Sequence, residues 1–103
     1  MVGFSVSTVD NASVRGYIMR SLVQGYHFSV TAKTLSNKLM ASGLISNPDI
    51  SNQLYYLEQL HLIEISNQSD AFSAIGNDAV VRLTAKGIHF IESGGDSEMG
   101  IDL

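Results

Sequence analysis

The chain of 103 residues contains no cysteine. Disulfide bonds, thiolate zinc sites and cysteine nucleophiles are therefore excluded. This absence fits a reducing compartment, and we expect a cytoplasmic protein. The sequence also has no apolar run of about 18 residues or more, which is the length that a membrane-spanning helix needs. Its first residues lack the basic and apolar segments of a secretory signal, so we expect no membrane partner.

Charged residues are scarce and unevenly distributed. Asp, Glu, Lys and Arg make up 16% of the chain, and the net charge is −4. Residues 87–103 carry four acidic residues and no Lys or Arg, so the preceding 86 residues are neutral in sum. We expect residues 94–103 to form a flexible acidic tail and residues 1–9, which show no clear period, to form a flexible arm. A single domain then covers residues 10–93.

Apolar periodicity and capping residues predict four helices, over residues 10–24, 32–42, 48–60 and 85–92. A side chain that can accept a hydrogen bond from the first helical turn stands before each of them. These predicted caps are Asp10 or Asn11, Thr31, Asn47 and Thr84. Gly16 lies inside the first predicted helix, where glycine costs about 1 kcal/mol relative to alanine. We therefore expect a neighbouring helix to pack closely against it.

Alternating apolar residues predict strands over residues 26–30, 62–65 and 79–83. The last two are joined by a polar segment and predict a hairpin, with Asn67 to Asp70 as a mobile connector. The order is helix, strand, helix, helix, strand, strand, helix. It predicts an α+β, mainly helical fold of the winged helix-turn-helix type. Such a fold has a three-helix core, a two-stranded wing and a C-terminal helix.

Two segments carry a resemblance to a known family. Residues 54–65, LYYLEQLHLIEI, resemble the end of a recognition helix that enters a wing, and residues 81–87, VRLTAKG, resemble the step that closes a wing. Residues 11–101 as a whole resemble the small ArsR-like winged-helix proteins of Mu-like phages and prophages. The resemblance implies a DNA-binding transcription regulator, which we expect to be a homodimer. The chain departs from this family at His61, where glycine is usual, and in having no Arg on the third helix.

The third predicted helix is the main candidate for DNA contact. Asn and Gln side chains can pair with adenine in the major groove of double-stranded DNA, and basic or hydroxyl side chains elsewhere can contact phosphates. Few candidates are basic, so we expect modest affinity and a shallow salt dependence unless the protein is a dimer. The candidate DNA-binding residues are Asn47, Ser51, Asn52, Gln53, Tyr55, Tyr56, Gln59, Thr31, Lys33, Thr34, Lys38, Arg15 and Arg82.

The sequence offers no arrangement of residues typical of an enzyme. There is no Ser/His/Asp set, glycine-rich phosphate loop or paired carboxylate, so we expect neither catalysis nor a cofactor. His27, His61 and His89 are far apart in the sequence, and we expect no metal site. The alternative to DNA binding is a winged-helix module that binds another protein. The net charge of −4 and the absence of Lys and Arg from the third helix favour this alternative.

Overall fold

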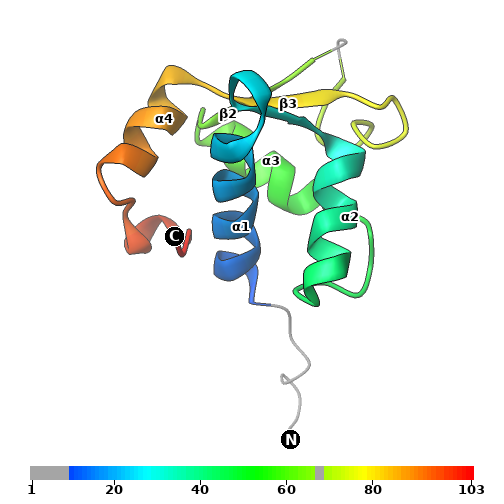
Figure 1. The fold of residues 1–103 in the computed structure, drawn as a ribbon, viewed down its shortest axis with the longest axis horizontal. Coiled ribbons are helices and arrows are strands. Elements are labelled where there is room, and N and C mark those ends of the chain that lie inside the picture. Colours follow the sequence, from blue (N-terminus) through cyan, green and yellow to red (C-terminus); the bar gives the residue numbers. More distant parts are fainter. Residues whose placement is uncertain (1–9, 67–68) are drawn as a thin grey trace, which may run out of the picture.

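The computed structural model describes residues 10–66 and 69–103. This part of the chain is an α+β fold with four α-helices, two 3₁₀ turns and one three-stranded sheet (Figure 1). The helices are α1 (Asn11–Gln24), α2 (Ala32–Ser42), α3 (Ser51–Gln59) and α4 (Ala85–Glu92). The strands are β1 (Ser29–Thr31), β2 (Ile63–Ile65) and β3 (Val80–Leu83). The 3₁₀ turns are η2 (Tyr26–Phe28) and η3 (Ser97–Met99).

The predicted starts of three helices are confirmed. The side chains of Asp10, Thr31 and Thr84 each accept a hydrogen bond from the backbone N–H three residues further on, which satisfies one free donor of the first turn. Gly43, with φ of 84°, ends α2 in the left-handed conformation that glycine adopts at little cost. Each of these caps depends on residues within one helical turn, so these helix ends can be predicted from the sequence alone.

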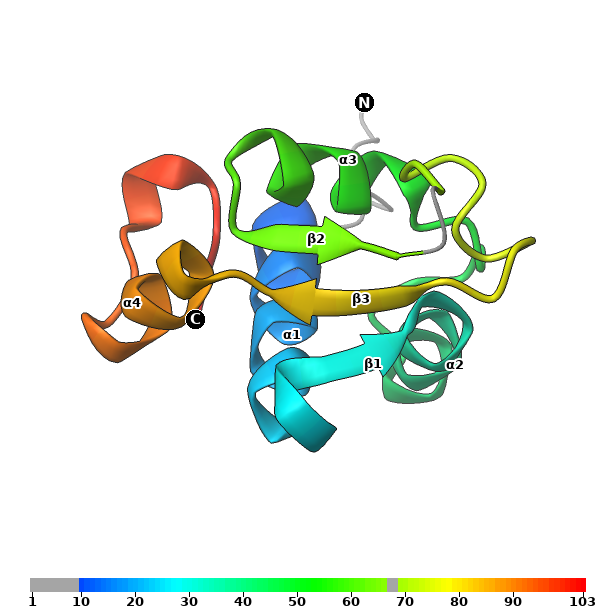
Figure 2. The same ribbon diagram turned by 90° about the horizontal axis from the view of Figure 1, so that it is seen from above.

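The sheet is antiparallel, with strand order β1-β3-β2 (Figure 2). The predicted hairpin is confirmed, since Ile63 pairs with Leu83 and Glu64 with Arg82. The predicted strand over residues 26–30 is wrong for its first three residues, which form η2, and β1 begins at Ser29. The chain doubles back tightly at this point. His27 and Phe28 have φ of 55° and 60°, in the left-handed region, so these residues cannot continue an extended strand. The close approach of the Ser29 carbonyl, 2.3 Å from where a Cβ on Gly25 would lie, leaves room only for glycine at the turn.

Helix α1 lies at the centre of the fold, with α2 and α4 on either side and the sheet across one end (Figure 1). Its residues Val14, Ile18, Met19 and Leu22 are completely buried. Burial of each such side chain contributes roughly 1.5–3 kcal/mol, so this helix is the main support of the core. The described helices include none that is long and apolar enough to cross a membrane.

Helix α3 begins later than the sequence predicts. Asn47 was expected to cap it with Pro48 in the first turn, but the helix starts at Ser51. The Asn47 side chain instead accepts from the Asp49 N–H at 2.9 Å, and the Asp49 carboxylate accepts from the Ser51 N–H at 3.0 Å. Two successive side-chain turns therefore replace the first helical turn. The Ser36 hydroxyl donates to the Pro48 carbonyl at 2.6 Å and fixes this turn against α2.

The prediction of a flexible tail over residues 94–103 is wrong, because this segment packs against α1. Ile101 is only 2% exposed and belongs to the core, and the Asp102 N–H donates to the Ala12 carbonyl at 3.0 Å. A side chain on Gly16 would lie 1.8 Å from the Asp102 carbonyl oxygen. The close neighbour of Gly16 is therefore the C-terminal segment and not, as predicted, a helix.

The loop between β2 and β3 also packs against the body of the domain. Residues 71–78 form successive turns, and Ala71 and Ala74 are buried at 2% and 0% exposure. The prediction of a mobile connector is therefore wrong for Ser69 and Asp70, whose side chains bond within the loop. Asn67 and Gln68 lie outside the described residues. Figure 2 shows this loop at the opposite end of the sheet from α4 and the C-terminal segment.

Candidate functional site

Helix α3 presents its polar residues on two different sides. Asn52, Tyr55 and Gln59 are exposed and recur at the spacing of one helical face. Gln53 and Tyr56 are half-buried and face the neighbouring elements. The residues that the sequence grouped as one DNA-binding helix are thus divided between an outer and an inner side.

The inner side of α3 is closed by α1 and the C-terminal segment. Arg15 donates from Nε to Gln53 Oε1 at 2.7 Å and from Nη1 to the Gly100 carbonyl at 3.1 Å. Its guanidinium carbon lies 3.7 Å from the ring centroid of Tyr56, a cation–π contact. The Tyr56 hydroxyl donates to the Met99 carbonyl. The side chains of Arg15, Gln53 and Tyr56 therefore each have a hydrogen-bond partner within the chain.

This cluster uses three of the predicted DNA-binding residues. The remaining amide group of Gln53 donates to Asn11 Oδ1 at 2.7 Å, so both ends of that side chain are bonded. Contacts of Arg15 with phosphate, or of Gln53 and Tyr56 with bases, remain predictions. They would require the present bonds to break. Such buried or half-buried bonds are each worth about 1 kcal/mol net, and more when one partner is charged.

The outer side of α3 is open and carries an exposed aromatic pair. Tyr55 is 46% exposed and Phe72, from the loop, is 60% exposed. Their ring centroids lie 5.4 Å apart with an interplanar angle of 39°. Phe72 is not among the residues predicted from the sequence, although a large apolar residue within a polar segment is a signal of such a site. Beside the pair is a groove of about 350 Å³, lined by Asn47, Pro48, Asp49, Ser51, Phe72 and Ile75.

One carboxylate, Asp49, lines this groove, and a second, Asp70, accepts a hydrogen bond from the backbone N–H of Phe72 in the loop. The Ser51 hydroxyl and N–H both donate to Asp49, and these bonds lower the pKa of its carboxyl group. The Ser73 hydroxyl and N–H, with the Phe72 N–H, act on Asp70 in the same way and lower its pKa. Both groups are therefore ionised at neutral pH. They flank the aromatic pair from the turn before α3 and from the loop.

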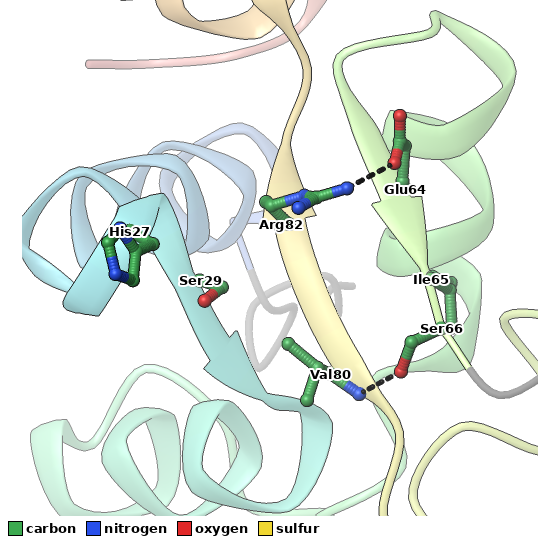
Figure 3. A pocket seen from close by; sticks show the side chains of 7 residues that line it. All are labelled: His27, Ser29, Glu64, Ile65, Ser66, Val80 and Arg82. Carbon is green, nitrogen blue, oxygen red and sulfur yellow. Dashed lines mark hydrogen bonds and ion pairs between the residues drawn. The ribbon is translucent and has the colours of Figure 1, made fainter.

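Arg82 lies on the outer face of the sheet, where its charge is paired. Its Nη2 is 3.1 Å from Glu64 Oε1, and both side chains are 58% exposed (Figure 3). Such a surface pair contributes about 0–1 kcal/mol. The pair borders a hollow of about 420 Å³ whose other side is formed by His27 and Ser29. Arg82 thus lines this hollow on the sheet and does not line the groove beside Phe72.

The remaining predicted phosphate contacts lie on or before α2. Lys33 and Thr34 are exposed, whereas Lys38 is half-buried. The Thr31 hydroxyl is occupied as the helix cap, since it accepts from the Thr34 N–H at 3.2 Å. Exposed Lys33 therefore lies on α2, and α3 itself contains no Lys or Arg.

The three kinds of comparison with known proteins identify no relative. No protein-family model, curated protein or solved structure matches the chain. Among the described residues, no group of three or more His, Asp or Glu side chains is arranged to hold a metal ion. Functional inference therefore depends on the geometry and charge of the faces described above.

Proposed function

We propose that the chain is a non-enzymatic winged-helix domain that binds a protein partner through the outer face of α3 and the adjoining loop. The order of helices and strands and the strand order β1-β3-β2 are compatible with a winged helix. In that fold, α2 and α3 form the helix-turn-helix pair, and β2 and β3 form the wing.

The observation that carries this proposal is the exposed pair of Tyr55 and Phe72 beside two ionised carboxylates. Exposed aromatic side chains are enriched at protein–protein interfaces, where they supply large contact areas. Fixed carboxylates repel the phosphates of a nucleic acid, whose binding depends on Lys and Arg. The charge and the aromatic content of this face both favour a protein partner over DNA.

Affinity capture with the immobilised chain tests this proposal. The Phe72→Ala variant should retain less than about a tenth of the protein that the unmodified chain retains from a lysate of the source organism. The reason is that aromatic side chains at interfaces often contribute over about 1.4 kcal/mol to the free energy of binding. Tyr26→Ala is the matched control, since Tyr26 is 83% exposed and lies in η2, away from α3. Equal retention by both variants, or no specific retention by the unmodified chain, would contradict the proposal.

A DNA-binding regulator of the phage type, acting as a homodimer, is the second candidate. Exposed Asn52 and Gln59 on one face of α3 favour it, because amide side chains can pair with adenine. Lys33, exposed in the first turn of α2, would supply a phosphate contact. Titration with duplex DNA at about 50 mM salt tests it, since phosphate contacts are strongest at low salt. Absence of binding there would rule it out. It would also be ruled out if the Lys33→Ala and Asn52→Ala variants both bound DNA as tightly as the unmodified chain.

A further inference from the structure

The groove beside Phe72 has a chemistry that defines its partner more closely than the proposed function does. Its apolar surface comes from Pro48, Phe72 and Ile75, and Tyr55 extends that surface along α3. Phe72 is 60% exposed, whereas its neighbours Ala71 and Ala74 are buried. An apolar side chain from a partner would therefore remove a substantial apolar surface from water.

The loop that presents Phe72 is held in place by its own contacts. Ala71 and Ala74 are buried, and the Ala79 N–H donates to the Ala74 carbonyl at 2.9 Å. The Asp70 side chain accepts from the Phe72 N–H at 2.9 Å. The aromatic ring is therefore presented by a backbone that is already ordered, which lowers the entropic cost of binding.

The charge at the groove has one sign. Asp49 lines it and Asp70 accepts from the backbone of Phe72, while none of the residues that line the groove is Lys or Arg. Each carboxylate is oriented by hydrogen bonds from its own turn. Neither of them forms a salt bridge within the described residues. A partner with positive charges around an apolar residue would complement this arrangement.

We propose that this groove binds a basic peptide segment of another protein, with an aromatic or branched aliphatic residue inserted beside Phe72 and Lys or Arg residues facing Asp49 and Asp70. This inference rests on the proposed function, since it specifies the partner of the same face. A second copy of the chain is disfavoured as the occupant, because its net charge is −4.

Selection of short random peptides displayed on phage, with the full chain as bait, tests this inference. We expect the selected peptides to carry a net positive charge and a recurring aromatic or aliphatic residue. Circular dichroism of the Phe72→Ala chain checks that it is folded, which is expected because Phe72 is largely exposed.

Fluorescence anisotropy then measures one selected peptide against four forms of the chain. Phe72→Ala should weaken binding by at least about tenfold, as for an interface anchor. Asp49→Asn with Asp70→Asn keeps the acceptor oxygens, removes both charges and should weaken binding about fivefold, an effect that salt should mimic. Tyr26→Ala should leave binding unchanged.

The outcomes distinguish failure of this inference from failure of the proposed function. Selected peptides that are acidic or neutral but depend on Phe72 would overturn the basic partner and leave protein binding by this face intact. Peptides whose affinity is independent of Phe72, or an empty selection, would overturn both. Dimerisation of the unmodified chain that Phe72→Ala abolishes, detected by analytical ultracentrifugation, would assign the groove to a second copy and overturn the basic segment.

Discussion

The two sides of helix α3 differ in what covers them. On the inner side, Gln53 and Tyr56 are held by Arg15 and the backbone of residues 99–100. On the outer side, Asn52 and Tyr55 remain exposed although each is next in sequence to one of the held residues. The same helix therefore uses one polar side for internal structure and leaves the other available for a partner.

This difference shows that a polar helix surface cannot be assigned to binding from its composition alone. Each side carries an amide and a tyrosine: Gln53 and Tyr56 on the inner side, Asn52 and Tyr55 on the outer side. What separates them is the C-terminal segment, which brings main-chain carbonyls to the inner side and an apolar residue, Ile101, into the core. Sequence changes on one side of α3, with changes on the other side as controls, should therefore differ in their effect on stability. The largest expected effect comes first.

Removal of the C-terminal segment should have the largest effect. Ending the chain after Gly95 deletes Ile101, whose loss from the core alone is expected to cost about 2–5 kcal/mol. The free energy of unfolding, measured by urea denaturation, should fall by at least this amount. Glu98→Gln, at an exposed position of the same segment, should change it by less than about 0.5 kcal/mol. Unchanged stability of the shortened chain would show that the segment does not support the core.

Gly16→Ala should destabilise the full chain but stabilise the chain that ends after Gly95. In the full chain the new methyl group would overlap the Asp102 carbonyl, 1.8 Å away, and we expect destabilisation of about 1–3 kcal/mol. In the chain that ends after Gly95, the same change should stabilise α1 by about 1 kcal/mol, the ordinary helix preference of alanine. Urea denaturation of the four proteins gives the coupling energy. An effect of the same sign in both backgrounds would refute close packing of the segment on Gly16.

Neighbouring tyrosines provide the most direct comparison of the two sides. Tyr56→Phe removes the hydroxyl that donates to the Met99 carbonyl and should lower the free energy of unfolding by about 1 kcal/mol. Tyr55→Phe removes an exposed hydroxyl with no described partner and should lower it by less than about 0.3 kcal/mol. Thermal denaturation followed by circular dichroism is the measurement. Equal effects would mean that the inner side is not more tightly held than the outer.

The smallest effect concerns the carboxylate that flanks Phe72. Hydrogen bonds from Ser73 lower the pKa of Asp70 in the folded chain, so the carboxylate contributes stability that is fully present above its unfolded pKa. That stability is lost as the pH falls through the lower folded pKa. The measurement is the urea concentration at the midpoint of unfolding, from neutral pH to below about pH 4. At neutral pH this midpoint should be slightly higher for the unmodified chain than for Asp70→Asn, and in acid the difference should disappear. A difference that persists in acid would assign the effect to packing.

How much could be predicted from the sequence depended on how far apart the interacting residues lie. The caps at Thr31 and Thr84 were correctly predicted, because each accepts from an N–H only three residues further on. The hairpin was predicted from the alternating pattern within each strand, although its paired residues, such as Ile63 and Leu83, lie far apart in the sequence. The start of α3 was mispredicted because Asn47 has two local uses, as a cap or within a turn, and the contact of Ser36 with Pro48 selects the turn.

The candidate site was less predictable than the fold. Arg15 was assigned to phosphate contact because its partner, Gly100, lies 85 residues away and leaves no local signal. The acidic residues of the C-terminal segment led to the prediction of an exposed tail and obscured the deeply buried side chain of Ile101. Phe72 was overlooked because its importance comes from Tyr55, which only the folded chain brings to it.

The docking of Asp102 against the first turns of α1 also has a consequence for folding during synthesis. The hydrogen bond between the Asp102 N–H and the Ala12 carbonyl joins the first described helix to nearly the last residues. Contacts between residues so distant in sequence form late and slow the folding of small domains. A ribosome must therefore release Ile101 and Asp102 from its exit tunnel before the core closes. Until then, the part of α1 around Ala12 and Gly16, which this segment covers, stays exposed.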